Sequence, residues 1–267
     1  MTTTDTYDLY AVRYAVHDRV AAANFLHPPD PHDGPMPIDY FVWAAVSEAR
    51  TFVIDTGFNA EVAAERGRTL IRCPTDGLKA IGIDAAQVED VIISHFHYDH
   101  VGNYDLFPRA TYHLQDDEMA FATGRHMCDP ETRSSFEIED VTGMVRQVYG
   151  GRVQFHDGDA ELAPGFSLHK IGGHTAGLQA ARVRTKRGWV VVASDACHLY
   201  ANMETGNPFP IIYDLDDVLA GYDTLKQLAD SDDHIIPGHD PQVMDRYPPV
   251  SEDLAGIAVR LDIAPVY

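Results

Sequence analysis

Short runs of β-branched and aromatic residues, separated by polar or glycine-containing turns, recur along the chain and predict β-strands. Near the start, DYFVWAAVS (39–47) and RTFVIDTG (50–57) predict two adjacent strands with a short polar link. The run VEDVII (88–93) predicts a buried strand. Further strands are expected at Tyr112–Leu114, Val153–Phe155, Phe166–Ile171, Gln179–Thr185, Trp189–Ser194 and His234–Ile236.

Segments with helical spacing of apolar residues lie between these strands. Residues 59–70 begin at an asparagine that can cap a first helical turn, and Ile138–Tyr149 repeat apolar residues at intervals of three and four. Other helices are expected at Thr75–Ile81, Asp116–Thr123 and Asp216–Ala229. Because helices and strands interleave and several strands follow one another directly, the order predicts a mixed α/β layered fold. No shift in composition marks a boundary, so we expect one domain over 1–267.

Charge and composition narrow the class of partner. The chain has 41 acidic and 20 basic residues and a net charge of −21. Nucleic acid and anionic membranes need basic patches, so neither is expected as a partner. No apolar run is long enough to span a bilayer. The N-terminal stretch has no secretory signal pattern, and the three cysteines form no CxxC pair, so we expect a cytoplasmic protein.

Metal-capable side chains follow the ends of five predicted strands. VEDVII leads directly into SHFHYDH, and the four other strands lead into DTG, GGHTAG, SDACH and PGHD. These segments carry His95, His97, Asp99, His100, Asp55, His174, Asp195 and His239. Because strand ends are rigid, they can hold metal ligands in position while loops shape the pocket around them.

A histidine taken alone is more often a surface or hydrogen-bonded core residue than a ligand. A tract of biased composition, however, would not place further ligands behind other strands, so we interpret the cluster as a metal site. In extended chain, side chains two residues apart point the same way, so His95 and His97 can share one ion. Asp99 and His100, past the turn, can reach a second ion. Imidazole and carboxylate ligands suit zinc, with iron, manganese or cobalt as alternatives.

The segment HFHYDHVGN, followed in order by GGHTAG, SDA and PGHD, resembles the ligand motifs of the metallo-β-lactamase superfamily, and the resemblance runs from His95 to His239. It implies an αββα four-layer sandwich with a dinuclear site at one edge of the two sheets. By position, it implies that one ion is bound by His95, His97 and His174, that the other is bound by Asp99, His100 and His239, and that Asp195 bridges both. Asp55 would orient a ligand histidine.

Branches of this superfamily differ in what surrounds the metals. The zinc β-lactamases themselves generally lack an aspartate at the position of Asp195 and are usually exported. The nucleases need a large insertion or an RNA-binding arm, whereas the segment between Asp195 and His239 is short and the net charge is −21. Glyoxalase II shares all seven ligands but adds a basic helical domain, and few residues follow His239. Flavodiiron relatives usually have a glutamate at the position of His97.

The chain is most similar to the lactonase branch that includes the N-acyl homoserine lactonases. Its length, its N-terminal segment before VIDTG and the stretch SDACHLYANMETGNPFPIIYD all agree with that branch. One departure is His198, which stands where known members have a tyrosine that assists the substrate oxygen; Tyr200 is a rival candidate. The substrate therefore stays open between an acyl homoserine lactone, another lactone, a thioester and a cyclic amide. A metal- or redox-sensing binding protein is the non-enzyme alternative.

Charge also predicts a mechanism. Two divalent cations outweigh Asp99, Asp195 and a bridging hydroxide, so the site is electrophilic and the hydroxide can attack an ester carbonyl. We expect Asp99 to accept the hydroxide proton and pass it to the leaving alkoxide. We expect His198 to orient the substrate or to protonate the leaving oxygen.

Two loops are expected to cover the pocket, the proline-rich segment 27–37 and the segment 203–212. Apolar side chains in and beside them could line it: Phe25, Leu26, Met36, Phe209 and Ile211. A small-molecule substrate is the expected partner. The N-terminal arm also makes a homodimer a hypothesis to test.

Overall fold

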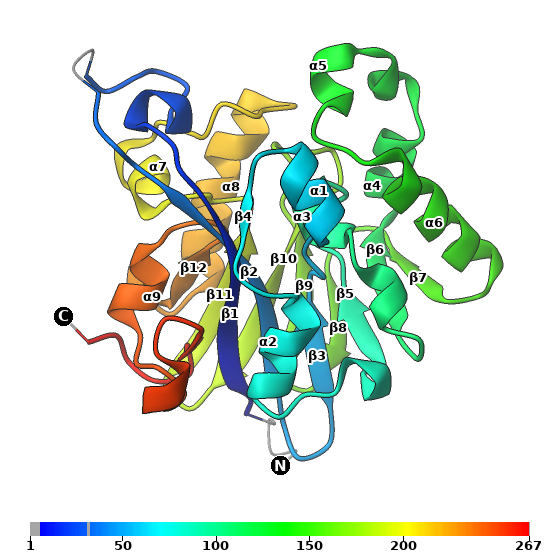
Figure 1. The fold of residues 1–267 in the computed structure, drawn as a ribbon, viewed down its shortest axis with the longest axis vertical. Helices are drawn as coiled ribbons and strands as arrows, with labels where there is room; N and C mark the ends of the chain where they lie inside the picture. The colour runs from blue at the N-terminus through cyan, green and yellow to red at the C-terminus, as the bar shows by residue number, and fades with distance from the viewer. Residues whose placement is uncertain (1–5, 31–32, 267) are drawn as a thin grey trace.

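Two β-sheets pack face to face in the computed structural model, which describes residues 6–30 and 33–266 (Figure 1). Within that part of the chain, one sheet has eight strands, in the order β13-β1-β2-β3-β5-β6-β7 with β4 paired to β1. The other has five strands, in the order β12-β11-β10-β9-β8. The neighbours β3, β5, β6 and β7 run parallel, as do β11 and β12.

The strands of the larger sheet are β1 (Asp8–His17), β2 (Ile38–Val46), β3 (Thr51–Ile54), β4 (Thr69–Leu70), β5 (Asp90–Ile92), β6 (Thr111–Gln115), β7 (Val153–His156) and β13 (Ala258–Arg260). The strands of the smaller sheet are β8 (Ala160–Ala163), β9 (Phe166–Lys170), β10 (Gln179–Thr185), β11 (Gly188–Ser194) and β12 (Ile235–Pro237).

The helices are α1 (Ala60–Glu65), α2 (Pro74–Ala80), α3 (Tyr98–Val101), α4 (Asp116–Ala122), α5 (Pro130–Arg133), α6 (Ile138–Tyr149), α7 (Tyr200–Thr205), α8 (Leu215–Leu228) and α9 (Gln242–Arg246). Short 3-10 helices lie at Ala21–Asn24, Ala85–Gln87, Tyr104–Leu106, Arg125–Cys128, Asp232–His234 and Glu252–Leu254.

Strand β2 shows how alternation along a strand builds the layers. Tyr40 and Val42 face an outer core that also contains residues of α1, α2, α3, α4 and α6. Phe41 and Trp43 face the opposite way, into a core shared with the smaller sheet. Because successive side chains of a strand point to opposite faces, a strand that is buried on both sides is apolar throughout.

The smaller sheet repeats this arrangement. Val190 and Val192 of β11 face the core between the sheets, whereas Val191 faces a third core that contains Val218 and Leu225 of α8. Between the sheets, Phe52 and Phe166 stack with ring centroids 4.0 Å apart. Three cores between four layers confirm the predicted αββα sandwich.

Most predicted elements are present, with ends shifted by at most three residues, but the helix expected over 59–70 is wrong at its C-terminal end. Asn59 caps α1 as predicted, accepting a hydrogen bond from the Val62 backbone N–H at 3.0 Å. The helix ends at Glu65 because Gly67 adopts φ +64°, a left-handed conformation that terminates helices. Thr69–Leu70 then pair with β1 as strand β4.

The N-terminal segment was not predicted as a strand. In the structure β1 pairs with β2 along almost its whole length and also with β13 and β4, so this part of the expected arm belongs to the larger sheet. Strands β8 and β13 and the short helices α3, α5, α7 and α9 were not predicted either. Pro31 and His32 of the expected 27–37 loop lie outside the described residues. Over those described, the structure has no helix with the length and apolar character needed to cross a membrane.

Candidate metal centre

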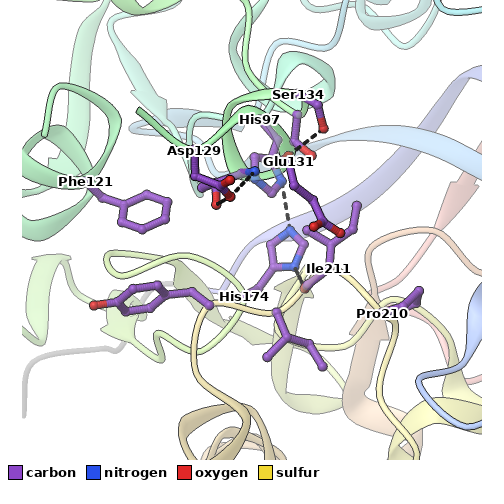
Figure 2. Close-up of a pocket in the computed structure, with 12 residues that line it drawn as sticks. His97, Phe121, Asp129, Glu131, Ser134, His174, Pro210 and Ile211 are labelled. Atoms are coloured by element: carbon purple, nitrogen blue, oxygen red, sulfur yellow. Dashed lines mark hydrogen bonds between the residues drawn. The ribbon is translucent and has the colours of Figure 1, made fainter. Parts of the chain in front are cut away.

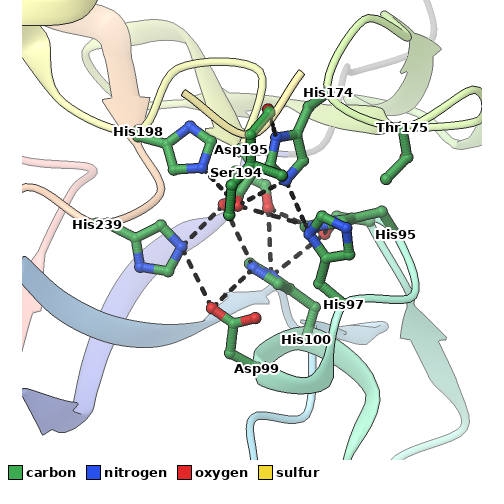
Figure 3. Close-up of polar contacts among 12 residues, drawn as sticks. His95, His97, Asp99, His100, His174, Thr175, Ser194, Asp195, His198 and His239 are labelled. Carbon is green, nitrogen blue, oxygen red and sulfur yellow. Dashed lines mark hydrogen bonds and ion pairs between the residues drawn. The ribbon is translucent and has the colours of Figure 1, made fainter. Parts of the chain in front are cut away.

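The predicted ligands gather at one edge of the sandwich, where strands from both sheets end (Figure 3). His95 follows β5 in the larger sheet, whereas Asp195 follows β11 and His239 follows β12 in the smaller one. His174 lies in the connection between β9 and β10. All seven side chains are buried: His95, His97, Asp99, His100, His174, Asp195 and His239.

The metal-capable atoms form two neighbouring groups, and a third group, Asp195, His198 and His239, overlaps both of them. In the first, one such atom from each of His95, His97, His174 and Asp195 lies within 4.8 Å of the others. The same limit holds for the second group, formed by Asp99, His100 and His239. The structure therefore brings together all seven predicted ligands, and their assignment to two ions stays a prediction.

Asp195 lies between the two groups. Its Oδ2 is 3.2 Å from His174 Nε2 and 3.7 Å from His95 Nε2. Its Oδ1 is 3.3 Å from His100 Nε2 and 2.9 Å from His239 Nε2. One carboxylate thus presents one oxygen to each group.

The outward ring nitrogens of four histidines have partners that orient them. His174 Nδ1 lies 2.7 Å from the Ile211 carbonyl oxygen, and His239 Nδ1 lies 2.9 Å from the Asp39 carbonyl oxygen. A carbonyl oxygen can only accept, so both Nδ1 atoms carry a proton, and each Nε2 is the nitrogen that a metal ion would take. His100 Nδ1 faces Asp55 Oδ2 at 2.8 Å, and His95 Nδ1 faces Ser94 Oγ at 3.0 Å. Such contacts fix the tautomer of metal-binding imidazoles.

The inward atoms fit a cation. His95 Nε2 and His100 Nε2 are buried and have no hydrogen-bond partner within the described residues, while Asp195 Oδ1 lies close to the His100 and His239 imidazoles. A buried polar atom without a partner costs about 1–3 kcal/mol. Divalent cations would satisfy these lone pairs, and imidazole with carboxylate is a donor set that suits zinc and other transition metals.

Burial and neighbouring charges set the protonation states. Burial lowers the pKa of His95 and of His97 well below the ordinary value, which favours the neutral imidazole that binds metal. Burial opposes the charged form of Asp195, but the facing imidazoles of His198, His239 and His100 hold its pKa well below the usual range. Asp195 is therefore a carboxylate.

Two serines that sequence analysis missed complete the contacts of Asp55. Ser94 donates its backbone N–H to Asp55 Oδ1 at 2.7 Å and its hydroxyl to Asp55 Oδ2 at 2.8 Å. Ser194 donates to Ser94 Oγ at 2.9 Å. Asp55 and Ser194 both have positive φ, 62° and 47°, which is strained for residues other than glycine and is typical of functional sites. The one local signal was that each serine directly precedes a predicted ligand.

Glu118 of α4 was also missed, and it ties two ligand segments together. Its Oε1 accepts the Phe96 backbone N–H at 2.8 Å, between His95 and His97. Its Oε2 accepts the Thr175 hydroxyl at 2.6 Å and the Gly177 backbone N–H at 3.0 Å, just after His174. The side chain is fully buried.

His198 and Tyr200, the two candidates for a role beside the metal ligands, occupy different surroundings. His198 Nε2 lies 2.9 Å from Asp195 Oδ2, and its ring stacks on Phe209 with centroids 4.1 Å apart. Tyr200 is buried in the core between the sheets, where the Arg246 guanidinium lies 3.9 Å from its ring centroid. Of the two, His198 borders the cavity at the ligands.

Two cavities open beside the ligands. A cavity of about 210 Å³ is bordered by Asp99, Asp195, His198 and His239, and a larger one of about 500 Å³ by His97 and His174. Figure 2 shows His97 and His174 facing each other in the wall of the larger cavity. Ile211, which was expected from sequence to line the pocket, borders both cavities.

Of the other predicted lining residues, only some border a cavity. Phe209 borders the smaller cavity, whereas Phe25, Leu26 and Met36 border neither cavity within the described residues. The two expected loops do meet, since the Asn207 side-chain amide accepts from the His27 backbone N–H at 3.0 Å and donates to the His27 carbonyl at 2.6 Å.

The αββα layers and the buried His/Asp cluster at their edge define the class of protein as a metallo-hydrolase. Residues 37–239 match the family described as the Metallo-beta-lactamase superfamily, and the chain belongs to that superfamily.

Known relatives and solved structures agree with this class. The chain is 28% identical to the N-acyl homoserine lactonase AiiB of Agrobacterium fabrum, over 87% of this chain and 91% of the relative. It is 30% identical to the N-acyl homoserine lactonase AttM of Azorhizobium caulinodans over 61% of this chain and 62% of that one. A crystal structure of an N-acyl homoserine lactone hydrolase, with N-hexanoyl-L-homoserine at its catalytic metal centre, superposes with a TM-score of 0.73. At 20% identity, over 91% of this chain and 96% of the other, that match shows the fold.

Proposed function

We propose that the protein is a dinuclear-metal hydrolase that opens a lactone ring. The observation that carries the proposal is the position of Asp195, which presents one carboxylate oxygen to each of two adjoining ligand groups. Seven buried ligands are more than one tetrahedral ion needs, whereas two adjacent ions sharing a carboxylate use them all. Zinc is the metal we propose first, with iron, manganese and cobalt as alternatives.

Each ligand has a role in holding the ions. His95, His97 and His174 would bind one, whereas Asp99, His100 and His239 would bind the other. When bound, two such ions supply a water of lowered pKa as nucleophile and a Lewis acid for the ester carbonyl.

The remaining steps fall to side chains at the smaller cavity. Asp99 lines this cavity, and we assign to it the proton released by the nucleophile, which it passes to the leaving alkoxide. His198 also lines it, with Nε2 directed at Asp195, and we assign to it the orientation of the substrate oxygen or its protonation. Stacking on Phe209 holds the imidazole in one plane.

Lactone chemistry is favoured over the alternatives by the relatives. Two relatives that match 87% of this chain and 91% of their own length are named N-acyl homoserine lactonase AiiB. Thioester and cyclic amide hydrolysis use the same nucleophile and stay as the alternative activities. A small molecule is the proposed partner, while the single domain over 1–267, the cytoplasmic location and the homodimer stay predictions.

The test is a substrate screen with product identified by mass. Purified protein loaded with zinc is incubated with N-acyl homoserine lactones, other γ- and δ-lactones, thioesters and cyclic amides. We expect the mass of at least one lactone to increase by that of one water. The Asp195→Asn variant should not produce this hydrolysis product. Turnover of thioesters or cyclic amides alone would contradict the lactonase assignment, and no turnover of any ester by metal-loaded protein would contradict the hydrolase.

A further inference from the structure

We propose that the smaller cavity binds a carboxylate of the substrate through Arg19 and Arg68, so that the lactone opened here is an anionic one. This inference rests on the proposed function and narrows its substrate class. It follows from the charge of these two guanidinium groups, from the hydrogen bonds that hold them in place, and from the N–H groups that those bonds leave unused.

Charge is distributed unevenly in this protein. The chain carries a net charge of −21, yet three arginines border the smaller cavity: Arg19, Arg66 and Arg68. The carboxylates in the same wall are Asp99 and Asp195, both assigned as metal ligands. Arginines gathered in one cavity of an acidic protein, beside aspartates that metal ions would neutralise, are a feature of a site for an anion.

Arg66 is already neutralised. Its Nε lies 2.7 Å and its Nη2 lies 2.6 Å from Glu137 Oε1, and its Nη1 donates to the Ser134 carbonyl at 2.9 Å. Within the described residues, Arg19 and Arg68 have no carboxylate within ion-pair distance. They are therefore the cavity arginines whose charge is left to a ligand.

Arg68 is anchored by polar groups that leave one end of its guanidinium unused. Its Nε donates to Tyr98 Oη at 3.0 Å, and Tyr98 Oη lies 3.0 Å from Tyr40 Oη. Its Nη1 donates to the Arg66 carbonyl at 2.6 Å and lies 3.1 Å from His17 Nε2. Its Nη2 has no hydrogen-bond partner among the residues that the structure describes.

Arg19 is also anchored by hydrogen bonds that leave one guanidinium nitrogen unused. Its Nε donates to Asn24 Oδ1 at 2.6 Å, and its Nη2 donates to the Ala23 carbonyl. The guanidinium lies 4.9 Å from the centroid of the Phe209 ring, which also stacks on His198. Its Nη1 has no hydrogen-bond partner in the described part of the chain.

Both guanidinium groups are half-buried and border the same cavity. Burial lowers the pKa of Arg19, and among the smaller contributions the charge of Arg68 lowers it while Tyr40 raises it. A carboxylate between the two groups would accept a charge-assisted hydrogen bond from each. The cavity volume of about 210 Å³ suits a small ring with a carboxylate substituent.

The experiment compares two lactones with the zinc-loaded protein. One is 5-oxotetrahydrofuran-2-carboxylate, and the other is its N-methylamide, which has the same ring without the charge. We expect kcat/KM to favour the carboxylate by about 10-fold or more, mainly through KM. Arg19→Met and Arg68→Met should each remove most of this preference, whereas Arg19→Lys and Arg68→Lys should keep part of it.

The matched control is the double variant Arg66→Gln/Glu137→Gln, which removes a cavity arginine together with its partner and leaves the net charge unchanged. We expect it to keep the preference. Equal or faster turnover of the N-methylamide by the unmodified protein would overturn the proposal. So would an unchanged preference in the Arg19→Met/Arg68→Met variant with full metal content.

A binding measurement separates this proposal from the lactonase assignment. Cyclopentanecarboxylate cannot be hydrolysed, and calorimetry should show that its binding weakens about 10-fold in Arg19→Met and Arg68→Met at unchanged zinc content. If neither lactone is turned over but this dependence holds, the lactonase assignment fails and the anion site stands. If lactones are opened but binding ignores both arginines, the anion site fails.

Discussion

Asp55 Oδ2 lies 2.8 Å from His100 Nδ1, at the end of β3 and beside the helical turn that carries Asp99. The same oxygen accepts the Ser94 hydroxyl, and Oδ1 accepts the Ser94 backbone N–H. Both oxygens therefore act as acceptors, which only a carboxylate can do. This contact keeps a proton on His100 Nδ1 and leaves Nε2, which lies 3.3 Å from Asp195 Oδ1, as the nitrogen that a metal ion would take.

Asp55→Asn is expected to weaken metal binding. The new amide would turn an NH₂ group either toward His100 Nδ1 or toward Ser94, and in the first case would move the imidazole proton to the metal-facing nitrogen. Loss of such an orienting group costs about 10- to 100-fold in metal affinity. Competition with a chelator, monitored by metal content, measures this.

The matched control for that substitution is Asp90→Asn. Asp90 Oδ1 also faces a histidine, at 3.2 Å from His113 Nε2, but His113 is not part of the ligand cluster. The metal affinity of the Asp90→Asn variant should equal that of the unmodified protein. Equal losses in both variants would mean that Asp55 acts through general stability rather than through His100.

Glu118→Gln is expected to loosen two ligand segments at once. An amide has one acceptor oxygen, so it cannot accept from both the Phe96 N–H and the Thr175–Gly177 segment. We expect metal affinity to fall about 10-fold or more and the free energy of unfolding to fall by about 1–3 kcal/mol. Thr175→Val removes one of the three hydrogen bonds and should have a smaller effect on both readings, measured by chelator competition and by urea unfolding.

His198→Phe is expected to lower kcat much more than metal content. The phenyl ring keeps the stacking on Phe209 but removes the nitrogen at 2.9 Å from Asp195. General acid–base groups contribute about 10²–10⁴-fold to rate, so a loss of at least about 100-fold is expected. Tyr200→Phe, in the core between the sheets, should leave kcat unchanged. A normal kcat for His198→Phe would remove His198 from the mechanism.

Asp140 on α6 provides a test of pH dependence away from the metal centre. Burial raises its pKa to about 7, from an ordinary 3.8, and Glu137 and Asp105 add to this. The folded state thus holds the proton more tightly than the unfolded state, so stability falls as the pH rises from about 4 to about 7. Each unit of such a shift corresponds to about 1.4 kcal/mol.

Asp140→Asn removes this charge and should raise Tm by several degrees at pH 8 relative to the unmodified protein. At pH 4 the two should melt alike, because Asp140 is then protonated in the folded state. Scanning calorimetry at both pH values measures the difference. Glu161→Gln, at an exposed position on β8, is the control and should show little change at either pH.

The fold could largely be predicted because its buried strands carry an unambiguous pattern. Strands β2 and β11 are apolar on both faces, and a short apolar run bounded by turns predicts such a strand. Strand β1 was harder to predict. Its register against β2 shifts between Arg13 and Ala15, so alternation along the segment is interrupted.

The ligands could be predicted for a different reason from their supports. The candidate ligands are histidines and aspartates that directly follow predicted strands, so both their residue type and their position can be read from the sequence. Glu118 has no such signal, because its hydrogen-bond donors come from other parts of the chain. They are Phe96 on one side and Thr175 and Gly177 on the other, all distant in sequence from α4. The same holds for Arg19 and Arg68, whose shared cavity exists only in three dimensions.

The central claim is that seven side chains hold two divalent ions with Asp195 between them. The most direct test is a crystal structure of zinc-loaded protein with anomalous data collected at the zinc edge. We predict two anomalous peaks, each about 2.0–2.2 Å from its histidine nitrogens. One peak should lie at coordination distance from Asp195 Oδ1 and the other from Asp195 Oδ2. A single peak, or two peaks that leave Asp195 uncoordinated, would contradict the account.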